Sequence, residues 1–207
     1  GFETIHRLLD QAEPAAGGPH PLLGDLVWTV LPATAAHPAR LSLHRRKVLP
    51  VEPSHPHLDG QLDRLPLPIP EEGAISVGSW QLTSSLGPPS MLPPTWRSRS
   101  DPWRAFLDAD QARDLVLATT RPGLQIAPLG LEGRRRAVGD LFTDHKTPPA
   151  LRPVWPLVLD RASGEALWVC GLAVSHTARI TPQTRCVRAL AWQPLGSREQ
   201  TPMSQAG

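Results

Sequence analysis

The chain has 207 residues, of which 40% are hydrophobic and 25 are proline. This length allows one large domain or two small ones with a real core, while a proline content far above the usual share of about 5% indicates long loops or linkers. The net charge of +2 is too small to indicate a nucleic-acid partner by itself. No apolar run approaches the ~20 residues that span a membrane, and no signal-peptide pattern opens the chain, so we expect a cytoplasmic protein without a membrane partner.

Residues 1–13 carry apolar side chains at helical spacing, and prolines and glycines then end the pattern. A single amphipathic helix of this length is marginal in water. We therefore interpret residues 1–13 as the terminal helix of a helical domain upstream of Gly1. The chain also opens without a methionine, which agrees with the C-terminal part of something longer.

Residues 22–83 are expected to form a β-rich connecting region. Within it, residues 22–48 predict a β-hairpin, and residues 73–83 predict a strand whose alternation slips around Gly78, as a β-bulge would allow. The basic run at residues 44–47 ends the second hairpin strand. This run is either a contact for an anionic partner such as RNA or an exposed strand end.

The segments between the predicted strands are loops without a predicted site. His55 and His57 lie close to Asp59, but no further ligand completes a metal site, so we expect none. Residues 84–102 are rich in proline and serine and are interpreted as a linker or a long surface loop.

Residues 103–193 contain short apolar runs separated by turn residues, which predict five or six strands and one central helix. The fold class is therefore α+β: a compact β-rich C-terminal domain with one central helix, preceded by the β-containing connection and the last helix of the upstream domain. Residues 194–207 are polar and are expected to be a disordered tail. Cys170 and Cys186 lie in apolar runs and are expected to be buried free thiols.

The predicted central helix carries an unusual cluster of positive charge at its start. On a helical wheel, four apolar residues share one face: Leu131, Val138, Leu141 and Phe142. The pattern predicts about three turns, with Arg134, Arg135 and Arg136 in the first turn. A cation there typically costs about 0.3–1 kcal/mol, because the helix dipole is already positive at that end. With Gly130 and Gly133 alongside, the stretch is either shaped for an anion such as phosphate or is a solvated arginine cluster.

The distribution of charge is more informative than the total. Residues 121–188 hold ten Arg or Lys and five Asp or Glu, a net charge of +5, so the remaining residues carry −3. Positive charge is therefore concentrated toward the C-terminal end, where we expect a polyanionic partner to bind.

Motifs for catalysis are missing from this sequence. It has no SGGxDS, GxxxxGK[ST] or GxGxxG loop, and no nucleophile elbow that would support a stand-alone hydrolase. His176 is the best single candidate for a base, but a turn or surface role suits it better. Trp155 and Trp168 could stack on bases, although their apolar flanks favour core packing. We predict no catalytic residue, cofactor or metal in this chain.

Five segments follow one another in an order that resembles the C-terminal region of the bacterial tRNA(Ile)-lysidine synthetase family: FLDAD (106–110), LVLATTRPGLQIAPLGLEG (115–133), LFTDHKTPPALRPVWPLV (141–158), WVCGLAVSHTARIT (168–181) and Thr184. The chain departs from the family where Leu124 and Gln125 replace the Asp-Arg that usually follows the glycine at position 123. Its arginine cluster also stands where the family usually has Lys-Lys or Lys-Leu.

The resemblance implies that the parent protein is an ATP-dependent ligase that attaches lysine to the wobble cytidine of CAU-anticodon tRNA(Ile). ATP and Mg would be bound by an N-terminal PP-loop catalytic domain of the same polypeptide, which is absent here. Residues 1–13 would end the helical substrate-recognition domain of that protein, and this chain would bind tRNA(Ile), chiefly at the acceptor stem. The expected RNA-binding residues are Arg121, Gly123, Arg134, Arg135, Arg136, Lys146 and Arg152. The alternative is a β-rich protein–protein interaction module without RNA binding.

Overall fold

The structure, a computed structural model, describes residues 20–21, 24, 26–31, 40–45, 55–58, 66–97, 101–149 and 151–195. The predicted helix at 1–13 and most of the predicted tail lie outside these residues. Within the described part of the chain, no helix is long and apolar enough to cross a membrane.

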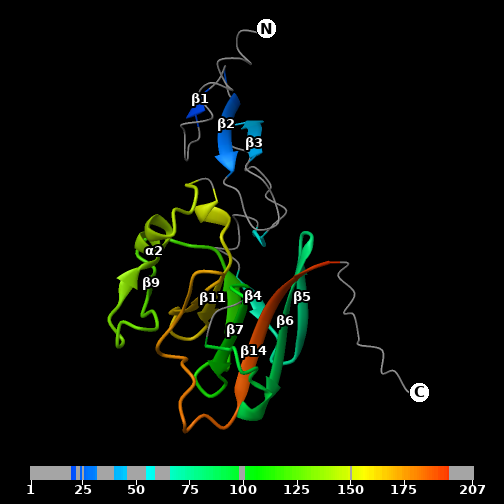
Figure 1. Ribbon diagram of the computed structural model, residues 1–207, viewed down its shortest axis with the longest axis vertical. Helices are drawn as coiled ribbons and strands as arrows, with labels where there is room; N and C mark the ends of the chain where they lie inside the picture. Colours follow the sequence, from blue (N-terminus) through cyan, green and yellow to red (C-terminus); the bar gives the residue numbers. More distant parts are fainter. Residues whose placement is uncertain are drawn as a thin grey trace, which may run out of the picture.

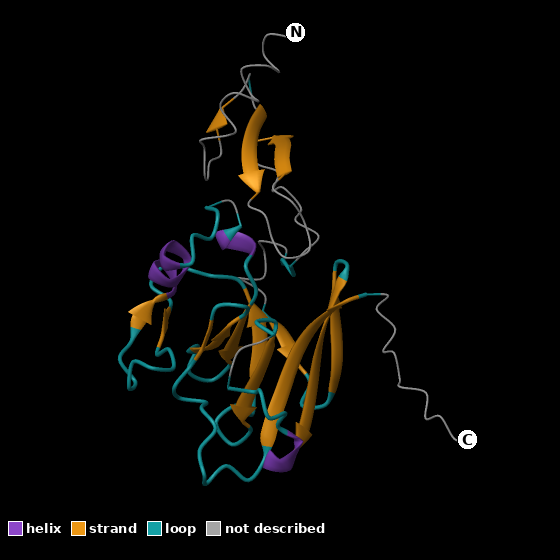
Figure 2. Cartoon of the chain, in the orientation of Figure 1, coloured by secondary structure: helices purple, strands orange, loops and turns teal. Residues whose placement is uncertain are grey.

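Two antiparallel sheets make up most of the molecule (Figures 1 and 2). The four-stranded sheet has the order β5-β6-β14-β7, with strands Gly73–Val77, Trp80–Gly87, Val187–Pro194 and Arg104–Asp108. The five-stranded sheet has the order β13-β12-β11-β8-β4, with strands Ala173–Val174, Ala166–Val169, Leu157–Asp160, Leu115–Ala118 and Leu67–Ile69.

The first hydrophobic core lies between these two sheets. Leu82, Leu107 and Leu190 come from the four-stranded sheet and meet Leu117 and Val158 of the five-stranded sheet, all of them buried. The side chains alternate along each strand, so every second residue reaches this core. The apolar runs in the sequence therefore do form strands, as predicted.

A second core covers the opposite face of the five-stranded sheet. Val116 and Leu157 point into it and pack with Leu141 and Phe142 of helix α2 (Val138–Asp144). A sheet buried on both faces needs strands that are apolar throughout, and all four residues of β8 are buried. The small ribbon of β9 (Gln125–Ile126) and β10 (Arg136–Ala137) lies on this same side (Figure 1). The predicted α+β class with one central helix is confirmed for the described residues.

Two single-turn 3₁₀ helices and a separate small sheet complete the described elements. The turns are η2 (Pro89–Met91) and η3 (Arg152–Val154). In the small sheet, β1 (His20–Pro21) pairs with β2 (Leu26–Leu31), and β2 pairs antiparallel with β3 (Arg40–Arg45). The predicted hairpin in residues 22–48 is confirmed.

The prediction of one bulged strand over residues 73–83 is wrong. Residues 73–77 and 80–87 are two strands of a hairpin, with Val77 opposite Trp80. Gly78 has a φ of +58°, which suits the tight two-residue turn that twisted strands favour. The change in the apolar alternation around Gly78 therefore marks the turn between two antiparallel strands.

Strands that precede residue 103 pair with strands of the predicted C-terminal domain. β6 runs through residues 84–87 of the expected linker and pairs with β14 along its whole length, and β4 pairs with β8. The two-sheet unit therefore begins by residue 67, well before residue 103. Residues 88–97 do form the expected surface loop, which contains η2.

The strand β14 carries an arginine into the first core. Arg188 is 1% exposed. Its Nε donates to the Ser84 hydroxyl at 3.0 Å, and its two terminal nitrogens donate to four backbone carbonyls, those of Ile69, Pro70, Ala112 and Arg113. All five N–H donors of the guanidinium are thus used. Burial lowers the pKa of Arg188, while the more distant charges of Glu71 and Asp114 raise it.

Candidate nucleic-acid interface

The predicted RNA-binding residues lie on the segment between β8 and α2 and just beyond that helix. After β8 the chain turns at Gly123, which has a φ of +79°, and the Leu124 amide donates to the Arg121 carbonyl at 3.2 Å. Leu124 is then buried in the second core, and its carbonyl accepts from the Val138 amide. Leu124, one of the two residues that differ from the usual family pattern, therefore connects the turn to the start of α2. Gln125, the other departure, remains exposed.

The predicted three-turn helix with arginines in its first turn is wrong. Helix α2 begins only at Val138 and has seven residues. Glu132 and Gly133 have φ angles of +50° and +85°, a left-handed conformation that cannot continue a right-handed helix. Arg134 and Arg135 therefore belong to an irregular turn, residues 130–135, which we call the arginine turn, and Arg136 begins β10. The argument from the helix dipole does not apply. Leu131, predicted on the apolar face, is 41% exposed.

Three of the predicted residues meet in one depression. Arg121, Gly123 and Arg135 line a cavity of ≈ 250 Å³ together with residues 163–165, and we call it the Arg121 cleft. Arg121 lies directly over Gly164, because a Cβ added there would come within 2.9 Å of the arginine Nη2. Arg135 is near Glu165, with 3.8 Å between Nη2 and Oε2. Arg121 and Arg135 are themselves exposed, so both guanidiniums remain accessible to an anion.

The remaining cations lie nearer α2 and are partly occupied. Arg136 forms an ion pair with Asp144 of the helix, 2.7 Å from Nη2 to Oδ2. Arg152 donates from Nε to the Thr147 carbonyl at 3.0 Å. Lys146 is exposed just after the helix with a φ of +52°.

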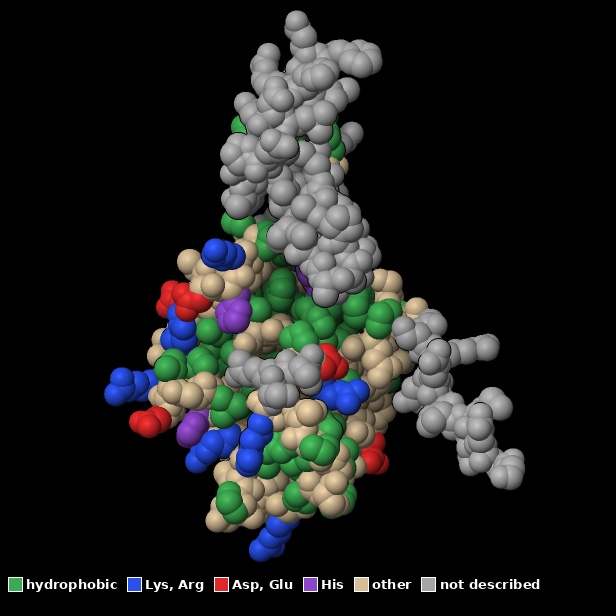
Figure 3. Space-filling view, in the orientation of Figure 1, with side chains coloured by type: hydrophobic (Ala, Val, Ile, Leu, Met, Phe, Trp, Pro, Cys, Tyr) green, Lys and Arg blue, Asp and Glu red, His purple; other side chains and the backbone are tan. Residues whose placement is uncertain are grey.

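The space-filling view shows Lys and Arg side chains over α2 and β9, at the left of the molecule, with acidic side chains among them (Figure 3). Arg134 is exposed, and no acid among the described residues pairs with it. Lys and Arg side chains therefore lie over this part of the molecule, but some of their charge is already paired with acidic groups.

The charge count over residues 121–188 overstated the available cations. Arg188 contributes nothing to the surface, because it is buried between the sheets. Arg161 pairs with Asp114 at 3.1 Å. The pattern of β14 could have revealed Arg188, since it shares a strand face with Leu190 and Trp192, both buried.

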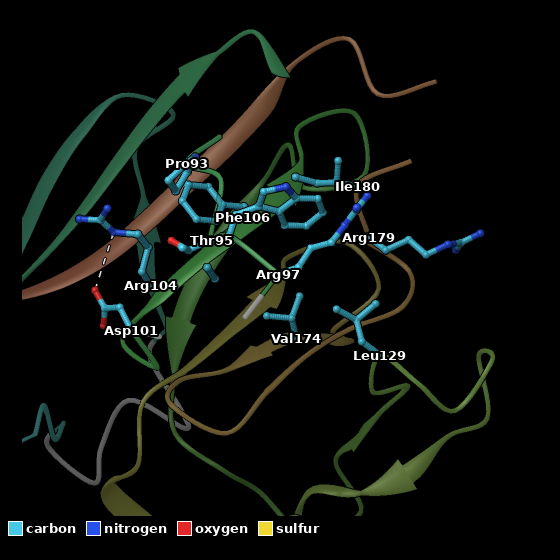
Figure 4. A pocket seen from close by; sticks show the side chains of 12 residues that line it. Pro93, Thr95, Arg97, Asp101, Arg104, Phe106, Leu129, Val174, Arg179 and Ile180 are labelled. Atoms are coloured by element: carbon cyan, nitrogen blue, oxygen red, sulfur yellow. Dashed lines mark ion pairs between the residues drawn. The ribbon is translucent and has the colours of Figure 1, made fainter. Parts of the chain in front are cut away.

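A larger pocket escaped the sequence analysis entirely. Its volume is ≈ 420 Å³, and it is lined by residues from the loop after η2, from β7 and β13, and from loops near residues 129 and 180. The cationic and aromatic members are Trp96, Arg97, Arg104, Phe106 and Arg179 (Figure 4). We call it the Trp96 pocket. Its parts are widely separated in the sequence, so no local motif marked it.

The tryptophan and histidine side chains for which the sequence favoured a structural role lie in or near the protein core. Trp155 and Trp168 are buried, as predicted. His55 is buried in an aromatic cluster, with its ring centroid 5.9 Å from that of Trp103 and 5.0 Å from that of Trp155. His176 is half-buried, and its amide donates to the Ala127 carbonyl. Among the described residues, no group of three or more His, Cys, Asp or Glu side chains could hold a metal ion.

The two cysteines are free thiols, as predicted. Cys170 is buried, as predicted, but Cys186 is only half-buried, so the prediction of a buried thiol is wrong there. Burial raises the pKa of the Cys170 thiol, which the Trp192 indole N–H contacts at 3.4 Å.

The first and last segments of the resemblance meet in space. Asp108 accepts a hydrogen bond from the Thr184 hydroxyl at 2.5 Å and another from the Asp110 amide at 2.9 Å. These contacts hold the end of β7 against the loop before β14. The motif residues here therefore support the fold rather than face a ligand.

Comparison with known proteins finds similar sequences for this segment. The TilS substrate C-terminal domain family matches residues 115–192. The tRNA(Ile)-lysidine synthase of Dehalococcoides mccartyi is 33% identical over 93 residues, and that of Geobacter sulfurreducens is 37% identical over 93 residues. These matches cover 44% and 42% of this chain, but each spans only 19% of the relative's length.

Two further matches cover more of the chain. The tRNA(Ile)-lysidine synthase of Symbiobacterium thermophilum is 30% identical over 137 residues, which are 64% of this chain and 27% of the relative. A crystal structure of a TilS C-terminal domain is 26% identical, with a TM-score of 0.48, over 64% of this chain and 92% of that one. Residues 115–192, which contain the arginine turn, therefore match the TilS C-terminal domain and resemble tRNA(Ile)-lysidine synthases, as the sequence analysis predicted.

Proposed function

We propose that this chain is the tRNA-recognition portion of a tRNA(Ile)-lysidine synthetase and that it binds the acceptor stem of tRNA(Ile). The parent enzyme would be cytoplasmic and would use ATP and Mg, held by an N-terminal catalytic domain, to ligate lysine to the wobble cytidine of the CAU anticodon. This chain would contribute binding rather than chemistry. The family match over residues 115–192 supports the proposal.

The observation that carries RNA binding is the exposure of Arg121, Arg134 and Arg135 on the family-matched segment. A-form RNA presents phosphates and 2′-hydroxyls to a protein, together with a shallow minor groove. Guanidinium groups suit phosphates because they offer several N–H donors in a fixed plane. The Arg121 cleft, at ≈ 250 Å³, is smaller than a typical small-molecule site. Glu165 is the one acidic residue in its lining, so the cleft offers no pair of carboxylates for acid–base catalysis.

Charge reversal tests this proposal directly. The double variant Arg134→Glu/Arg135→Glu should bind a refolded tRNA(Ile) transcript at least ~100-fold more weakly, because it replaces two phosphate contacts with two repulsions. The matched control is Arg113→Glu/Arg185→Glu, which makes the same charge change at exposed arginines outside the Arg121 cleft and the Trp96 pocket. Fluorescence anisotropy of a labelled transcript at fixed salt gives both affinities.

Equal losses in the two double variants would reduce the effect to net charge and contradict a localised interface. No loss in either variant would favour the alternative, a β-rich protein–protein interaction module. Thermal unfolding of each variant, followed by circular dichroism, shows whether the fold is retained.

A further inference from the structure

The Trp96 pocket has the size of a small-molecule site and is lined by two strands and several loops. Its volume of ≈ 420 Å³ falls in the range of about 300–1,000 Å³ that is typical of small-molecule sites. In Figure 4, Leu129 and Val174 lie along one side, with Phe106 across from them. The Asp101–Arg104 pair lies at one end and Arg179 at the other.

Aromatic and cationic groups are combined in this pocket. The guanidinium carbon of Arg97 lies 4.7 Å from the centroid of the Trp96 ring, a cation–π contact that fixes the arginine plane. Arg104 pairs with Asp101 at 3.8 Å. Neither Arg97 nor Arg179 has an acidic partner among the described residues. The pocket therefore has apolar flat walls and a surplus of positive charge.

The pocket adjoins the arginine turn. The Leu129 amide, one residue before that turn, donates to the carbonyl of Val174, and both residues line the pocket. Arg179 donates from Nη1 to the His176 carbonyl at 3.0 Å. The His176 ring in turn lies beside the arginine turn, because a Cβ added to Gly133 would be 3.7 Å from its Cδ2. An RNA held on the arginine turn thus passes close to the mouth of the pocket.

We propose that the Trp96 pocket binds one unpaired nucleotide of the RNA that the arginine turn holds. The base occupies the space beside Trp96 and Phe106, and its phosphate is held by Arg97 and Arg179. The inference rests on the proposed RNA binding. It extends that function by assigning a second subsite, for a single-stranded part of the same ligand.

The chemistry of the lining favours a nucleotide over simpler occupants. Proteins read unpaired RNA bases by stacking them on aromatic side chains and arginine planes, which tolerate any base because every base has a π face. A purely apolar ligand would leave Arg97 and Arg179 without a counter-charge, and a free phosphate would make no use of Trp96 and Phe106. Only a planar group that is covalently joined to an anion uses both.

Two RNA hairpins with the same stem test the subsite, one blunt-ended and one with a short single-stranded extension. In anisotropy titrations of the whole chain, Trp96→Ala should weaken binding of the extended hairpin by about 5- to 100-fold, the range for loss of one stacked base. Binding of the blunt hairpin should be unchanged. Trp96→Phe, which keeps an aromatic face, should restore most of the affinity.

A second pair of variants does not depend on the packing of Trp96. Arg97→Gln should weaken binding of the extended hairpin more than that of the blunt one. Arg113→Gln, the same change at an exposed arginine outside the pocket, should leave their ratio unaltered. An equal effect of Trp96→Ala and of Arg97→Gln on both hairpins, or no effect on either, overturns the subsite while leaving RNA binding intact. Failure of the unmodified chain to bind either hairpin would instead refute the proposed function.

Discussion

Two groups of arginine in this protein have opposite surroundings. Arg188 is 1% exposed and gives all five of its N–H donors to the protein itself. Arg134 and Arg135 are exposed on an irregular turn, and the nearest acid to Arg135 is 3.8 Å away. The first arginine joins the two sheets by binding carbonyls of the segments around residues 69 and 113. The other two keep donors that a ligand can use.

The comparison shows that the number of cations in a segment does not measure its capacity for anions. What decides is how many donors the fold has already used. Arg136 lies between the extremes, since it is half-buried and paired with Asp144 at 2.7 Å. We therefore expect a graded response to mutation, in stability at one end and in RNA binding at the other.

The largest effect is expected at Arg188. Arg188→Met should lower the free energy of unfolding by at least about 3 kcal/mol, because four buried or part-buried backbone carbonyls and the Ser84 hydroxyl lose their donor. Arg188→Lys offers three donors instead of five and should lose less. Urea denaturation measures both values. A stability of Arg188→Met within about 1 kcal/mol of the unmodified chain would show that the buried arginine does not hold the sheets together.

The sequence predicted what depends on local apolar patterning. The runs around Leu117, Val158 and Leu190 are strands, and Trp155 and Trp168 are buried because their flanks are apolar. These properties follow from short apolar runs bounded by turn residues, so they can be predicted without knowledge of the tertiary structure.

The sequence failed where backbone conformation or distant partners decide. Helical spacing continued from Leu131 to Phe142, but the left-handed backbone at Glu132 and Gly133 delays the helix until Val138. The partners of Arg188 lie 75 to 119 residues away along the chain, and no local pattern names them. The Trp96 pocket was missed for the same reason.

The next effect separates Arg134 of the arginine turn from Arg136 at the start of β10. Arg134→Gln should weaken binding of the tRNA(Ile) transcript by about 10-fold at 0.1 M salt and lessen the salt slope by about 1, as loss of one phosphate contact does. Arg136→Gln should have a smaller effect, because Asp144 already neutralises that cation. Both variants should keep their stability within about 0.5 kcal/mol. A larger loss for Arg136→Gln would reverse the proposed order of availability.

A smaller effect tests the backbone that presents the arginines. Gly133→Ala should destabilise the protein by about 1–2 kcal/mol, because its φ of +85° disfavours a residue with a Cβ. Gly139→Ala is the matched control, since it lies in α2 at an ordinary φ, with no atom within 4 Å of the added Cβ. That change should be neutral or stabilising by up to about 1 kcal/mol. Equal thermal shifts for the two variants would contradict the left-handed turn.

The smallest effect concerns the two thiols. Burial raises the pKa of Cys170, so its folded value lies above its unfolded one and this group stabilises the fold fully below about pH 8.5. The contribution falls as the pH rises further, because the unfolded thiol can then ionise. A thiol reagent at neutral pH should label Cys186 first and Cys170 only on unfolding. Mass spectrometry of the labelled peptides gives the order, and rapid labelling of Cys170 in the folded chain would contradict its burial.

The central claim is that exposed arginines on the family-matched segment hold RNA phosphates. The salt dependence of tRNA(Ile) transcript binding tests it most directly. If about four phosphates are neutralised, the logarithm of the association constant should fall against the logarithm of salt concentration with a slope of about −3 to −4, by analogy with duplex DNA. A flat response would contradict the account.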